Sequence, residues 1–203
     1  MPRPSRIDYQ GALHHVMNRG AAKRTVFPES VYFELFLGLL ADAAKEHRLQ
    51  IHAYCLMSNH FHLLVESDAG ELSEAMRDLT GRFTRIVNGW NGEDGPIFRG
   101  RFKSVPVRSE RQFLLVSRYI HLNPAEAGLV QTPVEWPWSS AAAYLRNSSI
   151  PQFLSTDRIL QLFEPSAASR EYAEFLAAGL DTPTARFYGR ERLPARFPGG
   201  APD

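Results

Sequence analysis

Two histidines, His60 and His62, lie one residue apart in the otherwise apolar stretch MSNHFHLLVE, residues 57–66. In a β-strand, residues two apart point to the same face, so both imidazoles would project together while Phe61 turns to the opposite side. Two imidazoles on one face can share a divalent metal ion. The alternative is a pair of strand histidines that are exposed or hydrogen-bonded elsewhere, and the pair alone leaves both interpretations open.

A second pair of polar side chains lies in the stretch SRYIHLNP, residues 117–124. If this stretch is helical, Tyr119 and Asn123 are four residues apart and share one face of the helix. A packing tyrosine and an asparagine that ends a helix before Pro124 would explain the two residues taken alone. Together with the histidine pair, a phenol and a carboxamide make up the groups of a metal-assisted phosphodiester cleavage site.

Basic residues gather in two regions, although the net charge of the chain is only +1. Residues 1–27 hold five basic side chains against one acidic, and residues 99–118 hold six against one. Phe98 and Phe102 alternate with arginines in PIFRGRFK, a pattern that suits single-stranded nucleic acid. A solvated surface is the alternative for either region alone. The predicted DNA contacts are Arg99, Arg101 and Lys103, then Arg19 and Lys23, and Arg118 beside the tyrosine.

The hydrophobic periodicity predicts the elements that must position these side chains. The expected order is strand, helix, two strands, helix, strand and a further helix. This is the split βαβ arrangement of a ferredoxin-like α+β fold, an antiparallel sheet with helices on one face and the other face free. The pattern does not fix where the last helix lies relative to that free face. The segments are residues 12–20, 29–47, 50–57, 60–66, 71–90, 102–108 and 109–123, the last ending at Pro124.

The C-terminal part predicts a small helical appendix. Short helices are expected in WPWSSAAAYL and STDRILQLF, and a longer one over residues 169–180. The tail from Asp181 is rich in Pro, Gly and Arg and lacks periodicity, so we expect it to be irregular. The domain prediction is a catalytic domain over residues 1–145, followed by a helical segment and tail over residues 146–203.

Composition excludes several classes of protein. The chain has no run of about 18 or more apolar residues, and its first residues lack the apolar segment of a signal peptide. Its single cysteine, Cys55, cannot form an internal disulfide and lies in an apolar run that predicts a core position. We therefore expect a cytoplasmic protein with no membrane association.

Four segments, LMSNHFHLLVE, FRGRFKS, SRYIHLNPAEAGLV and WPWSSAAAYL, occur in this order and spacing. They resemble the REP-associated tyrosine transposases of the HUH single-strand transposase superfamily, over a region from about Tyr9 to Leu145. The resemblance implies a ferredoxin-like catalytic domain that binds hairpin-forming, repetitive extragenic palindrome DNA and cleaves a single strand beside the hairpin. It also implies a partner DNA that is both single-stranded and hairpin-forming, and a monomer or homodimer.

The resemblance also implies a role for each site residue. Tyr119 matches the nucleophile, His60 and His62 match the two-histidine metal motif, and Asn123 falls where related enzymes place a third, polar ligand. Cleavage would leave a 5′-phosphotyrosine and a 3′-hydroxyl, with Mg²⁺ or Mn²⁺ as the expected metal ion. Two other functions stay open: a non-catalytic hairpin-binding protein, and a metal-dependent phosphodiesterase in which water attacks and Tyr119 only packs.

Overall fold

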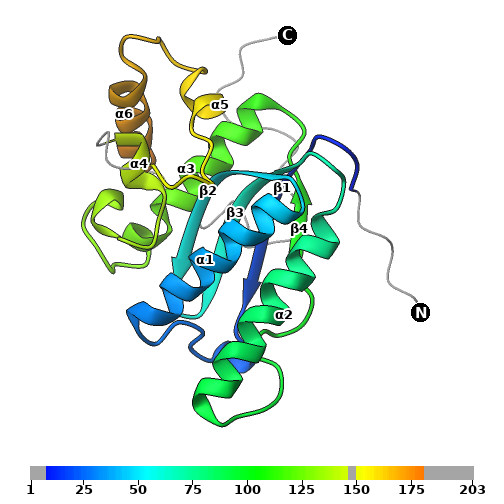
Figure 1. Cartoon of the computed structure of the whole chain (residues 1–203). Helices are drawn as coiled ribbons and strands as arrows, with labels where there is room; N and C mark the ends of the chain where they lie inside the picture. Colours follow the sequence, from blue (N-terminus) through cyan, green and yellow to red (C-terminus); the bar gives the residue numbers. More distant parts are fainter. Residues whose placement is uncertain (1–7, 146–149, 181–203) are drawn as a thin grey trace.

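The computed structural model describes residues 8–145 and 150–180. Within these residues, four strands form one antiparallel sheet in the order β2-β3-β1-β4 (Figure 1). With a helix after β1 and another after β3, this order is the predicted ferredoxin-like arrangement. The strands are β1 (Ala12–Arg19), β2 (Leu49–Met57), β3 (His60–Ser67) and β4 (Lys103–Pro106). Pro106 lies in β4, an edge strand, as its missing N–H requires.

Two long helices cover one face of the sheet, α1 (Ser30–Glu46) and α2 (Leu72–Asn91) (Figure 1). Gly92 ends α2 in the left-handed conformation at φ 62°, and its N–H donates to the Asn88 carbonyl. The buried sides of both helices pack on the side chains of β3 that point toward them. These include Phe61, Leu63 and Val65, which are fully buried.

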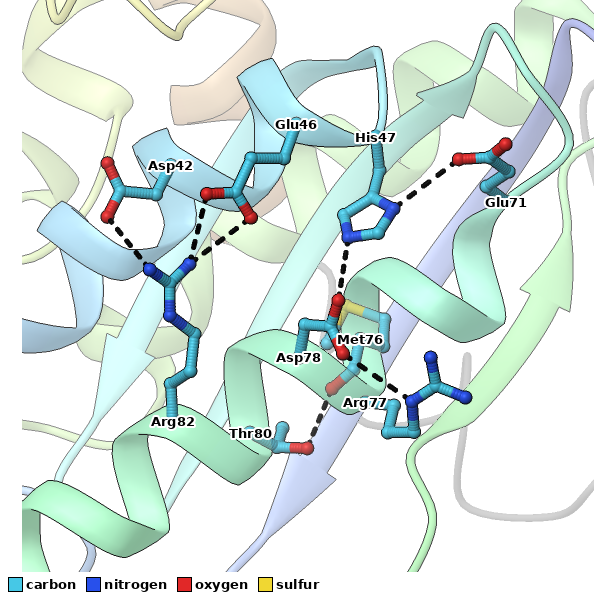
Figure 2. A network of polar contacts seen from close by, with 9 residues as sticks. All are labelled: Asp42, Glu46, His47, Glu71, Met76, Arg77, Asp78, Thr80 and Arg82. Carbon is cyan, nitrogen blue, oxygen red and sulfur yellow. Dashed lines mark hydrogen bonds and ion pairs between the residues drawn. The ribbon is translucent and has the colours of Figure 1, made fainter.

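Charged side chains connect the outer sides of α1 and α2, and Figure 2 shows this network. The Arg82 guanidinium lies 3.2 Å from a Glu46 carboxylate oxygen. His47, directly after α1, lies 3.4 Å from Glu71 and 3.0 Å from Asp78. The carboxylates and Arg82 are more than a third exposed, and only His47 is half-buried, so each pair contributes about 1 kcal/mol or less. The network links the two helices at their outer sides and takes no part in the site described below.

The second face of the sheet, which the sequence pattern left free, is covered by α3 (Glu110–Glu126). Strands β2 and β3 also carry apolar side chains on this face, among them Ala53 and Leu64. Removing these side chains from water stabilises the fold. Phe113, Val116 and Ile120 of α3 bury against them. The helix that carries Tyr119 is therefore packed directly onto the strands that carry the histidines.

The start of α3 is as predicted, and its end is not. Ser109 caps the helix by accepting a hydrogen bond of 3.2 Å from the Gln112 N–H. The helix passes through Pro124 and continues to Glu126, so the prediction that it stops at Pro124 was wrong. Pro124 has no N–H, so it removes one backbone donor from the last turn of the helix. Its ring is buried, and this packing keeps the turn helical.

The predicted C-terminal helices are present beside α3: α4 (Ala141–Leu145), α5 (Asp157–Leu160) and α6 (Ala168–Leu180) (Figure 1). Helix α6 packs along α3 and shares its core with β2 and β3. Two short 3-10 helices, η1 (Ala21–Lys23) and η2 (Pro133–Glu135), complete the described elements. No helix in the described ranges is long and apolar enough to cross a membrane. The predicted tail from Asp181 lies outside the described residues, and the division at residue 145 stays a prediction.

A buried polar network ties α3 to the C-terminal helices. Fully buried His121 lies 2.7 Å from the Tyr172 hydroxyl of α6 through Nδ1, and 2.7 Å from Ser140 Oγ through Nε2. The Tyr172 hydroxyl in turn lies 3.1 Å from Ser117 Oγ on α3. Because buried polar groups are costly to leave unpaired, these partners hold α3 in one position.

The packing of α6 on α3 gives a first testable prediction. A Cβ added at Gly179 would lie 2.7 Å from Leu122 Cδ1 and 2.8 Å from Arg118 Cδ. We expect Gly179→Ala to lower the free energy of unfolding by about 1–3 kcal/mol, because both side chains must move. Urea unfolding at pH 7 measures the change. Gly38→Ala on α1 is the control, since its Cβ meets nothing within 4 Å, and it should be neutral or stabilising. Equal losses in both variants would contradict the prediction.

Candidate active site

His60 and His62 project from β3 toward α3, on the face that the strand alternation predicts. Their ring centroids are 5.1 Å apart with the planes nearly perpendicular. His62 is buried, and His60 is half-buried. Burial lowers the pKa of His60, and burial together with the neighbouring imidazoles holds the pKa of His62 well below its usual value. Both rings are therefore neutral at pH 7, with lone pairs that can bind a metal ion.

Tyr119 and Asn123 reach the same place from α3. The Tyr119 ring meets the His62 ring edge to face, with centroids 5.3 Å apart. Asn123 hydrogen-bonds toward both His60 and the Tyr119 phenol, and these contacts partly offset the effect of burial on the pKa of each group. Its Nδ2 also donates to the Tyr119 carbonyl at 2.9 Å. The structure thus brings together the four residues that the sequence selected as nucleophile and metal ligands.

The Tyr119 phenol keeps its proton in this environment. Burial raises its pKa above the ordinary value of 10; the hydrogen bond with Asn123 partly opposes this increase, and the carboxylate of Glu126 adds a smaller increase. Attack by the phenol on phosphorus would therefore need an added positive charge nearby. A divalent metal ion at the histidines is one source of that charge.

The third histidine of the site, His15 on β1, was missed by the sequence reasoning. Its Nε2 lies 2.9 Å from His62 Nδ1, and its ring centroid lies 5.7 Å from that of Tyr119. Burial lowers the pKa of His15 to about 3, so this ring is neutral as well. Alternation along β1 puts His15 on one face with Leu13 and Met17, but it does not show that β3 pairs beside β1.

The donor atoms present fit a divalent metal ion. The described residues contain no group of three or more His, Cys, Asp or Glu side chains that could hold one, so a further ligand of another type is needed. His60 Nδ1 lies 2.7 Å from Asn59 Oδ1, an acceptor, and this contact favours the neutral form with the proton on Nδ1 and the lone pair on Nε2. Two imidazoles and the Asn123 amide oxygen leave positions for phosphate oxygens, which suits Mg²⁺ or Mn²⁺.

A groove of about 900 Å³ opens beside the histidines, and most of the predicted DNA contacts line it. Backbone hydrogen bonds hold the segment after β1 to the turn between β2 and β3 beside the groove: the Ser58 carbonyl accepts from Val26 N–H, and the Asn59 carbonyl accepts from Gly20 N–H. The lining residues include His60, His62 and five exposed basic residues, Arg19, Lys23, Arg99, Arg101 and Lys103. A second cavity, of about 560 Å³ near α5 and α6, contains none of the predicted site residues.

Two sequence interpretations take a different form in the structure, and a third is confirmed. Phe98 and Phe102 are both buried in the core, and Phe102 also lines the groove, so neither is the open stacking surface for bases that their alternation with arginines suggested. Arg118 lies against α6, with its guanidinium 4.4 Å above the Phe175 ring, and is the predicted DNA contact that the structure does not bring to the groove. Cys55 is fully buried and burial raises its thiol pKa, which confirms the predicted core position.

Comparisons with known proteins identify a family for this chain and a similar solved fold. The family model described as "Transposase IS200 like" matches residues 9–123, a range that contains all four predicted catalytic and metal-binding residues. A Haemophilus influenzae protein assigned as a REP-associated tyrosine transposase is 24% identical over 120 residues, which cover 54% of this chain and 68% of that protein. The solved structure of a REP-associated tyrosine transposase bound to a REP hairpin matches with a TM-score of 0.64 at 16% identity, covering 76% of this chain and 92% of the other.

Proposed function

Because the chain belongs to the IS200-like transposase family, we propose that it cuts and rejoins single-stranded DNA beside hairpin-forming repeats through a covalent bond to Tyr119. The observation that carries the proposal is the position of the Tyr119 ring, 5.3 Å from that of His62, with Asn123 hydrogen-bonding toward both Tyr119 and His60. A phenol beside a set of metal-binding donors is what nucleophilic attack on a phosphodiester requires. The similar fold of a hairpin-bound transposase supports the choice of a REP-type hairpin as substrate.

The proposed reaction exchanges one phosphodiester for another. The Tyr119 hydroxyl oxygen forms a bond to the scissile phosphorus, and the bond between phosphorus and the 3′ oxygen breaks. The phenol loses a proton, and the 3′ oxygen gains one and leaves as a hydroxyl. The products are a 5′-phosphotyrosine and a free 3′-hydroxyl, and attack by a 3′-hydroxyl on the phosphotyrosine reverses the step, so no external energy source is needed.

His60, His62 and Asn123 would hold Mg²⁺ or Mn²⁺, which supplies positive charge to the scissile phosphate and favours loss of the phenol proton. The chain's own residues set the geometry. Asn59 fixes the ring of His60 through a 2.7 Å hydrogen bond, and the packing of α3 on the sheet holds Tyr119 against His62. Burial of the phenol limits its contact with water, which would otherwise hydrolyse the covalent intermediate.

The basic groove would carry the single strand to this site, and Arg101 tests that path. Arg101 is exposed and lines the groove. We expect Arg101→Ala to weaken binding of a single-stranded oligonucleotide and to make the plot of log affinity against log salt shallower by about 0.7, the effect of one lost phosphate contact. Fluorescence anisotropy at several salt concentrations measures both. Arg77→Ala on α2 removes the same charge from an exposed side chain outside the groove and should leave the slope unchanged. Equal slopes for the two variants would contradict the proposed path.

The test of the proposed function is a search for the covalent adduct. The full chain is incubated with a labelled hairpin oligonucleotide that carries a single-stranded flank, with Mn²⁺ or with EDTA. The hairpins come from repeats of the source genome. The expected result is a metal-dependent product that survives denaturing electrophoresis and that mass spectrometry maps to Tyr119.

Two other outcomes would overturn the proposal in different ways. Tight hairpin binding without any adduct or cleavage would favour a non-catalytic binding protein. Metal-dependent cleavage without an adduct would favour a phosphodiesterase in which water attacks. We also propose that the protein acts as a monomer or homodimer, and size-exclusion chromatography with light scattering, with and without DNA, distinguishes the two.

A further inference from the structure

Each of the two metal-binding histidines has a partner at its Nδ1 atom. His60 Nδ1 lies 2.7 Å from Asn59 Oδ1, from the residue just before it. His62 Nδ1 lies 2.9 Å from Nε2 of His15, which comes from a different strand and is fully buried. The partner of His60 is local in the sequence, whereas the partner of His62 is brought in by the pairing of β1 with β3.

We propose that His15 is a positioning residue for His62: it accepts a hydrogen bond from His62 Nδ1–H and so fixes His62 in the form that presents Nε2 to the metal ion. This inference rests on the proposed function, because it assigns His62 as a metal ligand. The number of protons on each ring requires this arrangement. A neutral imidazole carries one N–H, and a metal ion needs the lone pair of the other nitrogen. If Nε2 of His62 binds the metal ion, Nδ1 must carry the proton, and His15 Nε2 must accept it.

The same contact orients the ring. A hydrogen bond at one nitrogen of a metal-binding histidine fixes its rotation and increases the basicity of the other nitrogen. His15 also meets Tyr119, with ring centroids 5.7 Å apart and the rings close to perpendicular. One buried side chain therefore contacts both a proposed metal ligand and the proposed nucleophile, and limits the movement of each.

His15 is not itself placed as a third ligand. The described residues contain no group of three His, Cys, Asp or Glu side chains that could hold one ion, which excludes His15, His60 and His62 as a joint ligand set in this geometry. The nitrogen of His15 that faces the site, Nε2, lies at hydrogen-bonding distance from His62. Its position is that of the second layer of a metal site, where histidine ligands usually find a carboxylate, carbonyl or water.

The first measurement reads the proton position directly, without metal or DNA. Long-range ¹H–¹⁵N correlation spectra of the metal-free protein distinguish the two neutral forms of each histidine. We expect His62 to carry its proton on Nδ1, and in His15→Leu we expect that preference to be lost. A wild-type His62 protonated on Nε2 would overturn the inference, whatever the outcome for activity.

The second measurement is metal affinity. We expect His15→Leu to weaken Mn²⁺ binding about 10- to 100-fold, measured by electron paramagnetic resonance titration without DNA. His15→Gln, which offers an amide oxygen as acceptor, should recover most of the affinity. His14→Leu is the matched control: it removes the neighbouring buried imidazole, which contacts Ser104 on the other face of the sheet. It should bind Mn²⁺ as the wild type does, and circular dichroism checks that each variant folds.

The outcomes separate this inference from the proposed function. Wild-type affinity in a folded His15→Leu variant would overturn the positioning role alone. Pulsed electron paramagnetic resonance that detects three histidine nitrogens on bound Mn²⁺ would also overturn it, in favour of direct ligation by His15. A wild-type protein that binds no Mn²⁺ would instead overturn the proposed metal site, and the inference with it.

Discussion

The Tyr119→Phe variant is expected to form no covalent adduct with a hairpin oligonucleotide, while it binds that oligonucleotide with nearly unchanged affinity. The substitution removes one oxygen atom, the one that would form the bond to phosphorus, and leaves the ring that packs 5.3 Å from His62. We expect strand cleavage to fall by at least about 1,000-fold, as when the nucleophile of a covalent mechanism is removed.

Denaturing electrophoresis and mass spectrometry measure the adduct, and fluorescence anisotropy measures the affinity. Tyr32→Phe is a matched control, because the Tyr32 hydroxyl donates to Asn91 on the outer side of α1 and α2, away from the site. It should cleave and form adduct as the wild type does. Cleavage that survives in Tyr119→Phe would assign the attack to water, and an adduct that survives would assign it to another side chain.

The second large effect expected is loss of stability in mild acid. Burial lowers the pKa of His15 and of His121 from 6.5 to about 3. In the unfolded chain these imidazoles bind a proton near pH 6.5, whereas in the folded protein they stay neutral until about pH 3. The unfolded state therefore takes up more protons as the pH falls. The contribution of these two histidines to the free energy of unfolding is fully present above pH 6.5 and decreases below it.

The size of this effect follows from the two pKa values. Between pH 7 and pH 5, each of the two histidines should lower the free energy of unfolding by about 2 kcal/mol, or about 4 kcal/mol together. His14, His52, His60 and His62, whose pKa values are also lowered by burial, act in the same direction. Such a loss is a large fraction of the stability of a domain of this size.

Urea unfolding at pH 7, 6 and 5, in the presence of EDTA so that metal binding does not contribute, measures the loss. The His121→Gln variant lacks one of these two imidazoles. The decrease in its free energy of unfolding from pH 7 to pH 5 should therefore be about 2 kcal/mol smaller than in the wild type, whatever the stability of the variant at pH 7. A free energy of unfolding that is constant between pH 7 and pH 5 would show that these imidazoles are not buried in their neutral form.

Most of the fold was predictable because each element carries its own periodicity. The alternation in β3 placed His60 and His62 on one face, and the helical spacing of α3 placed Tyr119 and Asn123 on one face. The order of strands and helices was enough for the ferredoxin-like sheet, because that connection pattern has few compact solutions. The family resemblance then selected the two pairs as one site.

Other features depended on contacts between distant segments. Phe98 and Phe102 alternate with arginines, yet they point into the core, since the segment after α2 is held against the sheet. Pro124 looked like the end of α3, but its burial allows the helix to pass through it. In both cases packing across the domain outweighed a local signal.

The sequence by itself therefore determined which side chains share a face of their own strand or helix, because that direction follows from the local backbone geometry alone. Only the tertiary structure decided which faces meet. The docking of α3 on the sheet brings Tyr119 to His62, and the pairing of β1 with β3 brings His15 to His62. These contacts are set by the burial of apolar surface between segments far apart in the chain, which no local pattern records.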